Sequence, residues 1–240
     1  MTTLLYVAIP YACLTSFVVG LFWRYRYDKF GWTTRSSQLY EGRQLALASP
    51  LFHFGILAVF AGHAIGLLIP ATWTDAIGIP ESTYHAVAAV AGAVAGIAAA
   101  VGLAMLIWRR RLTRSIFKVT TPMDKAMYLV LGVVIGLGLI NTIALNALGL
   151  GHDYRADVSV WIRSILLLQP QPELMAVAPL SFQLHGLAAF ALIALWPFTR
   201  LVHVFSVPLG YVARPYVVYR TRDPRAGVRA PRRGWEPPGS

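Results

Sequence analysis

Residues 86–108 read AVAAVAGAVAGIAAAVGLAMLIW, a run in which no side chain carries a charge. At about 1.5 Å of rise per residue, an α-helix of this length covers the hydrocarbon core of a bilayer, which is about 30 Å thick. Residues 126–146 form a second uncharged run. Of all 240 residues, 57% are apolar and only 13% are charged, whereas soluble chains carry about 25% charged residues. The composition excludes a disordered chain and an ordinary soluble domain, and it predicts an all-α polytopic membrane bundle.

Three further apolar segments are long enough to span a membrane. The five predicted spans cover residues 4–22, 51–69, 86–108, 126–148 and 182–204. The first is followed by Arg24 and Arg26 rather than by a small-residue cleavage site, so we interpret it as a retained span and not as a signal peptide. Cys13 is the only cysteine, which excludes a disulfide framework and a cysteine-ligated zinc or iron–sulfur site within the chain.

The basic side chains divide unevenly between the two sides of the predicted bundle. Of the 21 Lys and Arg residues, all except Arg155 and Arg163 lie in the loops after the first and third spans, at the end of the fifth span or beyond it. The positive-inside rule makes this side cytoplasmic, which places the N-terminus outside and the C-terminus inside. The net charge of +11 therefore reflects membrane topology, and we expect no nucleic-acid partner.

Two segments lie outside the five spans. The outer connection, residues 149–181, contains a mostly apolar stretch at 161–168 that is too short to span. We expect it to form a helix that lies on the outer surface or packs over the bundle. From residue 208 the chain is rich in Pro and Arg. We therefore divide it into a membrane domain, 1–207, and a cytoplasmic tail, 208–240, which is disordered or ordered by a partner.

Four of the six histidines lie in two spans, with His53 and His63 in the second and His185 and His203 in the fifth. Ionisable side chains are rare in spans and indicate function, although an interhelical hydrogen bond also explains a single one. Because these spans run in opposite directions, we expect His53 and His203 near the cytoplasmic face. By the same reasoning, His63 and His185 lie near the outer face. Imidazole is an axial ligand of haem iron, so the arrangement predicts two b haems, one per pair.

The spacing along the two spans tests this pairing. At about 1.5 Å per residue, His53 and His63 lie about 15 Å apart, whereas His185 and His203 lie about 27 Å apart. Both pairs cannot be level in straight, parallel helices, so we expect a difference in tilt, a kink at Pro197 or inclined haem planes. His53 and His63 also project about 80° apart around their helix.

Small and basic residues accompany the histidines. Gly55, Gly62 and Gly66 flank the ligands of the second span, and Gly186 follows His185. We expect them to leave room for a flat macrocycle, although small residues also serve helix packing. Basic side chains at the inner end of the third span are candidate partners of the haem propionates, or else act only as topology determinants. These are Arg109, Arg110 and Arg111, and Arg200 at the inner end of the fifth span is a further candidate.

The two histidine-containing blocks carry a resemblance to a known family. Residues 49–57 read SPLFHFGIL, followed by Gly62 and His63, and residues 196–208 read WPFTRLVHVFSVP after Leu184 and His185. With these blocks the chain resembles the gamma subunit of respiratory nitrate reductase, the membrane cytochrome b of that complex. The resemblance covers nearly the whole chain, including the five spans.

The resemblance implies a function in quinol oxidation. In that family the subunit binds two b haems through four histidines and takes electrons from quinol near the outer face. It passes them to a cytoplasmic iron–sulfur beta subunit and a molybdenum-containing alpha subunit. Carried over to this chain, His53 and His203 would hold the inner haem, and His63 and His185 the outer haem. The chain would be the quinol-oxidising subunit of a complex in a bacterial cell membrane, inactive on nitrate alone, with residues 208–240 docked on its partners.

One departure from the family pattern concerns the quinol site. Some members have a lysine near the start of the third span that is implicated in quinol binding, whereas this chain reads ESTYH at 81–85. We expect His85, together with Gly66, at the quinol site, because an imidazole can hydrogen-bond a quinol oxygen and accept its proton. The alternative is an interfacial histidine that faces water.

Two other functions fit the same residues. A di-haem subunit of another iron–sulfur oxidoreductase would have the same spans and histidines but a different partner. A haem-free transporter or scaffold would use the histidines to relay protons or to join helices, although the chain shows no internal repeat of the kind that transporters have.

Overall fold

The computed structural model describes residues 1–28, 42–148 and 150–206, and within these ranges the regular elements are helices without any strand. Five segments are long and apolar enough to cross a membrane: Leu4–Tyr27, Arg43–Leu68, Glu81–Leu112, Pro122–Ala144 and Leu180–Phe198. The predicted all-α bundle with five spans is confirmed, and its orientation in the membrane stays a prediction. The tail at 208–240, with the domain boundary before it, lies outside the described residues.

Each span is built from one long helix, in places extended by a tighter or wider turn. The first span joins a π-helical turn, η1 (Leu4–Ala8), to α1 (Ile9–Tyr27). The second and third are α2 (Arg43–Leu68) and α4 (Glu81–Leu112). The fourth continues from α6 (Pro122–Leu139) through a π-helical turn, η3 (Ile140–Ala144), into α7 (Leu145–Ala147). The fifth is α10 (Leu180–Leu195), followed by the 3₁₀ segments η4 (Trp196–Phe198) and η5 (Arg200–Ser206). Short connecting helices are α3 (Ala71–Ala76), α5 (Arg114–Lys118), α8 (Val158–Leu166) and α9 (Pro172–Val177).

Local sequence explains where the spans begin and end. Glu81 lies in the first turn of α4 and three arginines lie in its last turn, so the charges at both ends complement the helix dipole. α6 begins with a capping box, in which the backbone N–H of Asp124 donates to Thr121 Oγ1 (3.1 Å) and the backbone N–H of Thr121 donates to Asp124 Oδ2 (3.0 Å). These signals bracket the reversal between α4 and α6 that contains α5.

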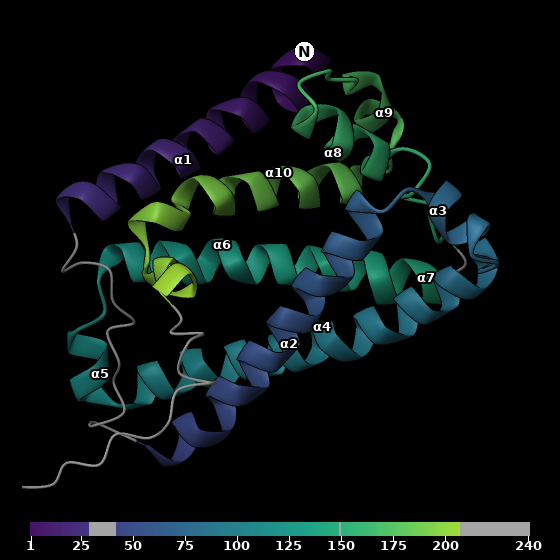
Figure 1. Ribbon diagram of the computed structural model, residues 1–240. Coiled ribbons are helices and arrows are strands. Elements are labelled where there is room, and N and C mark those ends of the chain that lie inside the picture. The colour runs from purple at the N-terminus through teal and green to yellow at the C-terminus, as the bar shows by residue number, and fades with distance from the viewer. Residues whose placement is uncertain (29–41, 149, 207–240) are drawn as a thin grey trace, which may run out of the picture. The chain divides into compact units, whose positions relative to one another are not determined.

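Helices α2 and α4 cross at close range (Figure 1). A Cβ atom at Gly55 would lie 2.5 Å from the backbone nitrogen of Ala99, and one at Gly102 would lie 2.5 Å from that of Phe52. Gly55 therefore serves this crossing, and the expectation that it leaves room for a macrocycle is wrong. The same expectation is wrong for Gly66 and Gly186, where a Cβ would lie 2.6 Å from Tyr154 Oη and 2.9 Å from Met175 Cε. A Cβ at Gly62, in contrast, would have no atom within 4 Å.

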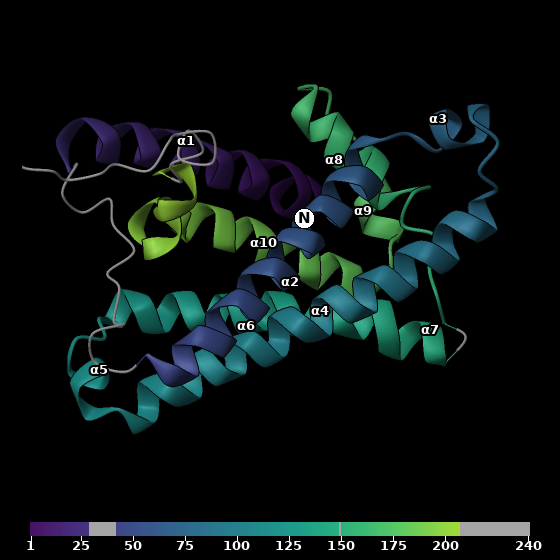
Figure 2. The same cartoon turned by 60° about the horizontal axis from the view of Figure 1, so that its bottom comes forward.

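Helix α10 lies between α1 and α6 in both views of the ribbon (Figures 1 and 2). The connection before it packs over one end of these helices. Trp161 on α8 is fully buried with Tyr6, Ile165, Met175 and Phe190, and its indole N–H donates to the carbonyl of Tyr6 (2.9 Å). The expected short helix at 161–168 is thus α8, and of the two placements predicted for it, packing over the bundle is confirmed.

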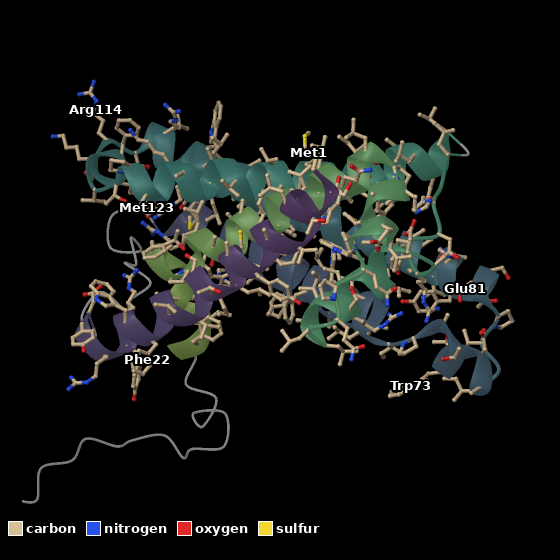
Figure 3. All side chains as sticks on the ribbon, turned by 90° about the horizontal axis from the view of Figure 1, so that it is seen from above. Met1, Phe22, Trp73, Glu81, Arg114 and Met123 are labelled. Carbon is tan, nitrogen blue, oxygen red and sulfur yellow. The ribbon has the colours of Figure 1, made fainter. Side chains whose placement is uncertain are left out.

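The two ends of the bundle differ in charge. We call the end that carries Arg24, Arg114 and Arg200 the basic end, and the end that carries Glu81 and Asp153 the acidic end. Figure 3 shows Arg114 and Met123 at one extreme and Trp73 and Glu81 at the other. Helices α1 and α4 finish at the basic end, where α6 starts. The basic side chains thus gather at one end of the bundle, as the prediction of the orientation of the spans requires.

The fifth span departs from its predicted course at the basic end. The α-helix stops at Leu195, and the 3₁₀ turn η4 contains Pro197, which has no N–H to continue the helical ladder. Thr199 then adopts an extended conformation with φ −110° and ψ 178°, so η5 turns away from the axis of α10 (Figure 1). His203 therefore lies on η5, and the separation of about 27 Å calculated for one continuous helix does not apply.

Candidate functional site

The first histidine pair lies toward the basic end. His53 on α2 and His203 on η5 face each other with ring centroids 6.0 Å apart and ring planes at 70°. The second pair lies toward the acidic end, where His63 on α2 and His185 on α10 have ring centroids 5.9 Å apart and planes at 34°. The structure thus brings together the same partners that the antiparallel spans predicted. The oblique course of α2 and the turn into η5 reconcile the unequal spacings along the chain (Figure 1).

Hydrogen bonds fix the tautomer of three of these rings. Nδ1 of His53 lies 2.7 Å from the carbonyl oxygen of Ser49, Nδ1 of His63 lies 2.8 Å from that of Val59, and Nδ1 of His203 lies 2.6 Å from that of Arg200. A carbonyl can only accept, so Nδ1 carries the proton, and in the neutral ring Nε2 is the nitrogen that has the lone pair. Metal-bound histidines have this arrangement, with the second nitrogen held by an outer hydrogen bond.

The spacing of the rings matches the coordination of one metal ion from two sides. With metal–nitrogen bonds of about 2 Å, two imidazoles on opposite faces of an ion have ring centroids about 6 Å apart. The two observed separations, 6.0 and 5.9 Å, agree with this value. The four residues therefore fit two bis-imidazole haem sites, one toward each end of α2.

An ion pair anchors the segment that carries His203. Arg200 binds Asp124 on α6 through two contacts, Nη2 to Oδ2 (2.8 Å) and Nε to Oδ1 (3.0 Å). Trp196 Nε1 donates to the carbonyl of Leu201 (3.0 Å), and Arg24 on α1 donates to that of Pro197 (2.6 Å). These contacts hold η4 and η5 to both neighbouring spans.

The candidate propionate partners at the end of α4 have other contacts. Arg110 Nη1 donates to Thr120 Oγ1 (3.0 Å), and its guanidinium lies 5.5 Å from the ring centroid of Tyr128. Arg111 lies over the ring of Phe117 at 5.8 Å. Arg109 is 2% exposed. The structure joins Arg110 and Arg111 to the turn around α5 and the start of α6, and their assignment to propionates stays a prediction.

His85 belongs to a polar cluster at the acidic end. Its Nε2 lies 3.3 Å from Asp153 and 3.4 Å from Glu81. Arg155 pairs with Glu81 (2.9 Å) and donates to Thr74 Oγ1 (3.1 Å). These residues, with Tyr84 and Tyr154, form what we call the acidic-end cluster.

Gly66, the other residue predicted for the quinol site, contacts this cluster. A Cβ atom at Gly66 would lie 2.6 Å from the hydroxyl oxygen of Tyr154. The hydroxyls of Tyr84 and Tyr154 lie 3.5 Å apart, and the rings of His85 and Tyr154 lie 6.0 Å apart. Burial first, and then the hydrogen bond with Tyr84, raise the pKa of the Tyr154 phenol above its ordinary value. The cluster therefore presents a neutral phenol one turn beyond His63.

The cluster also has the donor atoms for a metal ion. Glu81, His85 and Asp153 offer ligand atoms within 4.8 Å of one another. However, Glu81 is already paired with Arg155, whose side chain is 2% exposed, and this pairing accounts for the arrangement. The sequence does not indicate that Asp153, Tyr154 and Arg155 belong to a site, because each is remote in the chain from α4 and lies in no local motif.

The whole membrane region matches one family of proteins. Residues 2–222 fit the family model described as nitrate reductase gamma subunit. The chain belongs to this family. Together with the five membrane-length helices, this makes it a multi-pass bacterial membrane protein. The resemblance on which the sequence predictions rested is confirmed.

Members from three bacteria illustrate the relationship. The chain is 54% identical over 237 residues to the nitrate reductase-like protein NarX of Mycobacterium tuberculosis, a match covering 98% of this chain and 36% of that protein. It is 45% identical over 220 residues to the nitrate reductase gamma chain of Bacillus subtilis, covering 92% and 98%. It is 34% identical over 218 residues to the respiratory nitrate reductase 2 gamma chain of Escherichia coli, covering 90% and 96%. The chain therefore spans about a third of NarX but nearly all of the gamma chains.

Proposed function

We propose that the chain is the membrane cytochrome b subunit of a nitrate reductase complex. In this function it oxidises quinol near the acidic end of the bundle and delivers electrons to a cytoplasmic iron–sulfur subunit. The observation that carries the proposal is the presence of two imidazole pairs with ring centroids 6.0 and 5.9 Å apart, in which the Nδ1–H groups of three rings donate to backbone carbonyls. Membership of the gamma-subunit family supports nitrate reductase over another oxidoreductase partner and over a haem-free transporter.

The four histidines would hold two b haems, the inner one between His53 and His203 and the outer one between His63 and His185. When bound, the haems supply one-electron carriers at two depths of the membrane. The backbone carbonyls of residues 49, 59 and 200 orient three of the imidazoles. The open space at Gly62 lies beside His63 and leaves room for a macrocycle to approach α2.

The acidic-end cluster would receive the protons of quinol. His85 has its Nε2 within 3.4 Å of two carboxylates, and an imidazole can accept a proton from a quinol hydroxyl. Arg155 holds Glu81 in place by an ion pair. The side chain of Asp153 is 51% exposed, so a proton that reaches it passes directly to water.

The partner subunits are part of the proposal. Cys13 is the only cysteine, so this chain cannot bind an iron–sulfur cluster through its own thiolates. We infer an iron–sulfur beta subunit and a molybdenum-containing alpha subunit, and we expect no nitrate reduction by this chain alone. Co-purification with a molybdenum-containing, nitrate-reducing subunit separates this function from that of a di-haem anchor for another oxidoreductase.

An absorption spectrum tests the haem assignment. We expect the dithionite-reduced protein to show b-type absorbance corresponding to two haems per chain. His53→Ala and His203→Ala should each remove the same haem, and His63→Ala and His185→Ala the other. His152→Ala is the matched control, because His152 binds Asp157 (2.7 Å) outside both pairs, and it should keep both haems. Absence of b-type absorbance, or retention of both haems by all four variants, would contradict the proposal.

A further inference from the structure

Asn141 has a buried side-chain amide that makes no hydrogen bond to any residue the structure describes. It lies in the π-helical turn η3 within the fourth span, and the residue is 7% exposed. Both Nδ2 and Oδ1 are buried, and neither has a hydrogen-bond partner among the described residues. An unpaired amide is costly in a membrane interior, and π-helical turns occur frequently at functional sites. The two observations together indicate a ligand.

A second asparagine in the same span behaves differently. Nδ2 of Asn146 donates to the carbonyl of Thr142 (2.8 Å), four residues earlier in the chain. A local hydrogen bond of this kind accounts for a polar side chain in an apolar helix. Asn146 thus needs no ligand, and it provides a control for Asn141.

The contacts of neighbouring residues show which way Asn141 faces. Leu139 and Thr142 both lie against α4, at Gly96 and Gly92. Gly138, one residue before Leu139, faces α10, because a Cβ there would lie 3.2 Å from Cε1 of His185. Gly138 comes one residue before Leu139, and Asn141 comes one residue before Thr142. Because Leu139 and Thr142 share the face toward α4, Gly138 and Asn141 share the neighbouring face, which is the one toward α10.

The position along the helix places Asn141 beyond the histidine pair. The fourth span runs from the basic end to the acidic end. Asn141 is three residues, or about 4.5 Å of helical rise, further toward the acidic end than Gly138. It therefore lies between the level of His185 and the acidic-end cluster, where the proposed function requires quinol.

The hydrogen-bonding capacity of the amide defines the ligand. Asn141 offers an unused donor and an unused acceptor at the same place, and a hydroxyl is the simple group that satisfies both, because it accepts from Nδ2–H and donates to Oδ1. A carboxylate or a quinone carbonyl only accepts. We propose that Asn141 binds a hydroxyl of quinol beside the His63–His185 pair and holds the reduced substrate more tightly than the oxidised product. This inference rests on the proposed function.

Leucine at position 141 tests the proposal, because it keeps the size of the side chain and removes both polar atoms. In the assembled complex, menadiol is used to reduce the b haems, and dithionite, which needs no quinol site, measures total reducible haem. We expect Asn141→Leu to raise the menadiol concentration for half-maximal haem reduction by about tenfold. The inhibition constant of menadione should rise by a smaller factor, and the dithionite-reduced spectrum should not change.

Two further variants complete the experiment. Asn146→Leu should behave like the wild-type protein. Asn141→Thr retains a hydroxyl that donates and accepts, so it should keep the half-saturating menadiol concentration within about threefold. Unchanged menadiol dependence in Asn141→Leu would overturn the inference, as would loss of one b haem, which would assign Asn141 to the macrocycle. If the wild-type complex has no b haem, or menadiol does not reduce it, the proposed function fails as well.

Discussion

The two histidine pairs are alike in their ring spacing and different in what holds them. At the basic end, His203 lies on a 3₁₀ segment fixed by the Arg200–Asp124 ion pair. At the acidic end, His185 lies in a regular α-helix and packs against Gly138. One site therefore depends on electrostatic anchoring of an irregular segment, and the other on close packing between two helices. Two sites built from the same residue type therefore respond to different substitutions: one to loss of an ion pair, and the other to crowding between helices.

Removal of the ion pair should have the largest effect and should affect the basic end. Asp124→Leu leaves the Arg200 guanidinium, whose side chain is 14% exposed, without its carboxylate. We expect a loss of about 3 kcal/mol in the free energy of unfolding, measured by thermal unfolding. Haem content should show selective loss of the haem that we propose at the His53–His203 pair.

A double variant separates the ion pair from other roles of Asp124. Asp124→Leu combined with Arg200→Met replaces both charges by apolar groups, which is often nearly neutral, and should recover most of the stability. Equal loss of both haems in the single variant would contradict the idea that the ion pair serves one site.

Crowding at Gly138 should have the next largest effect and should affect the other end. A Cβ atom there would lie 3.2 Å from the His185 ring, so Gly138→Val should displace the ring, cost about 2 kcal/mol and remove the haem of the His63–His185 pair. Gly136→Val is the matched control, because a Cβ at Gly136 would have no atom within 4 Å. If the two variants have the same haem content, packing does not hold His185.

A smaller change is expected from His85, and it should appear in the rate of quinol oxidation rather than in haem content. His85→Gln removes the proton acceptor and keeps a polar side chain. Since Asp153 remains in the cluster, we expect the menadiol-dependent rate of haem reduction to fall about tenfold, less than the 10²–10⁴ typical of a sole general base. A wild-type rate would place proton release elsewhere.

The smallest effect is expected for Tyr154→Phe. Loss of the hydroxyl contact with Tyr84 should cost about 1 kcal/mol below pH 10 and leave both haems in place. The folded-state pKa of Tyr154 is raised above its ordinary value of 10.0, so its contribution to stability is complete below that pH and decreases as pH rises above it. Thermal unfolding of both proteins between pH 8 and about pH 11 should therefore show the difference only at the lower values. A constant difference across this range would contradict the pKa shift.

Much of the fold and of the pairing could be predicted because membranes constrain both strongly. Uncharged runs of 20 residues have few other interpretations. The direction of each span follows from the order of the spans, so the sequence alone pairs His53 with His203. A kink at Pro197 is one of the predictions that reconcile the histidine spacings, and the end of α10 at Leu195 agrees with it. The course of η5 beyond the kink could not be predicted, because it depends on tertiary contacts such as the one between Arg200 and Asp124.

The errors and omissions also have physical causes. The sequence suggests room for a macrocycle at Gly55, because a glycine pattern does not show which helix approaches it. The structure places the α4 backbone there. Asn141 and Asn146 look equivalent in the sequence, and only their contacts distinguish them. The acidic-end cluster joins residues of α4 to Asp153 and Arg155, about 70 positions away, and no local pattern indicates such a contact.

The burial of Trp161 has a consequence for biogenesis. Its indole bonds to the carbonyl of Tyr6, and Tyr6 also bonds to Gln183. α1 packs chiefly against α10 and η4. The partners of α1 are therefore synthesised more than 150 residues after it. The intervening spans α2, α4 and α6 contact one another through α4 and are synthesised before α10, so α1 is packed later than these spans although it precedes them in the chain.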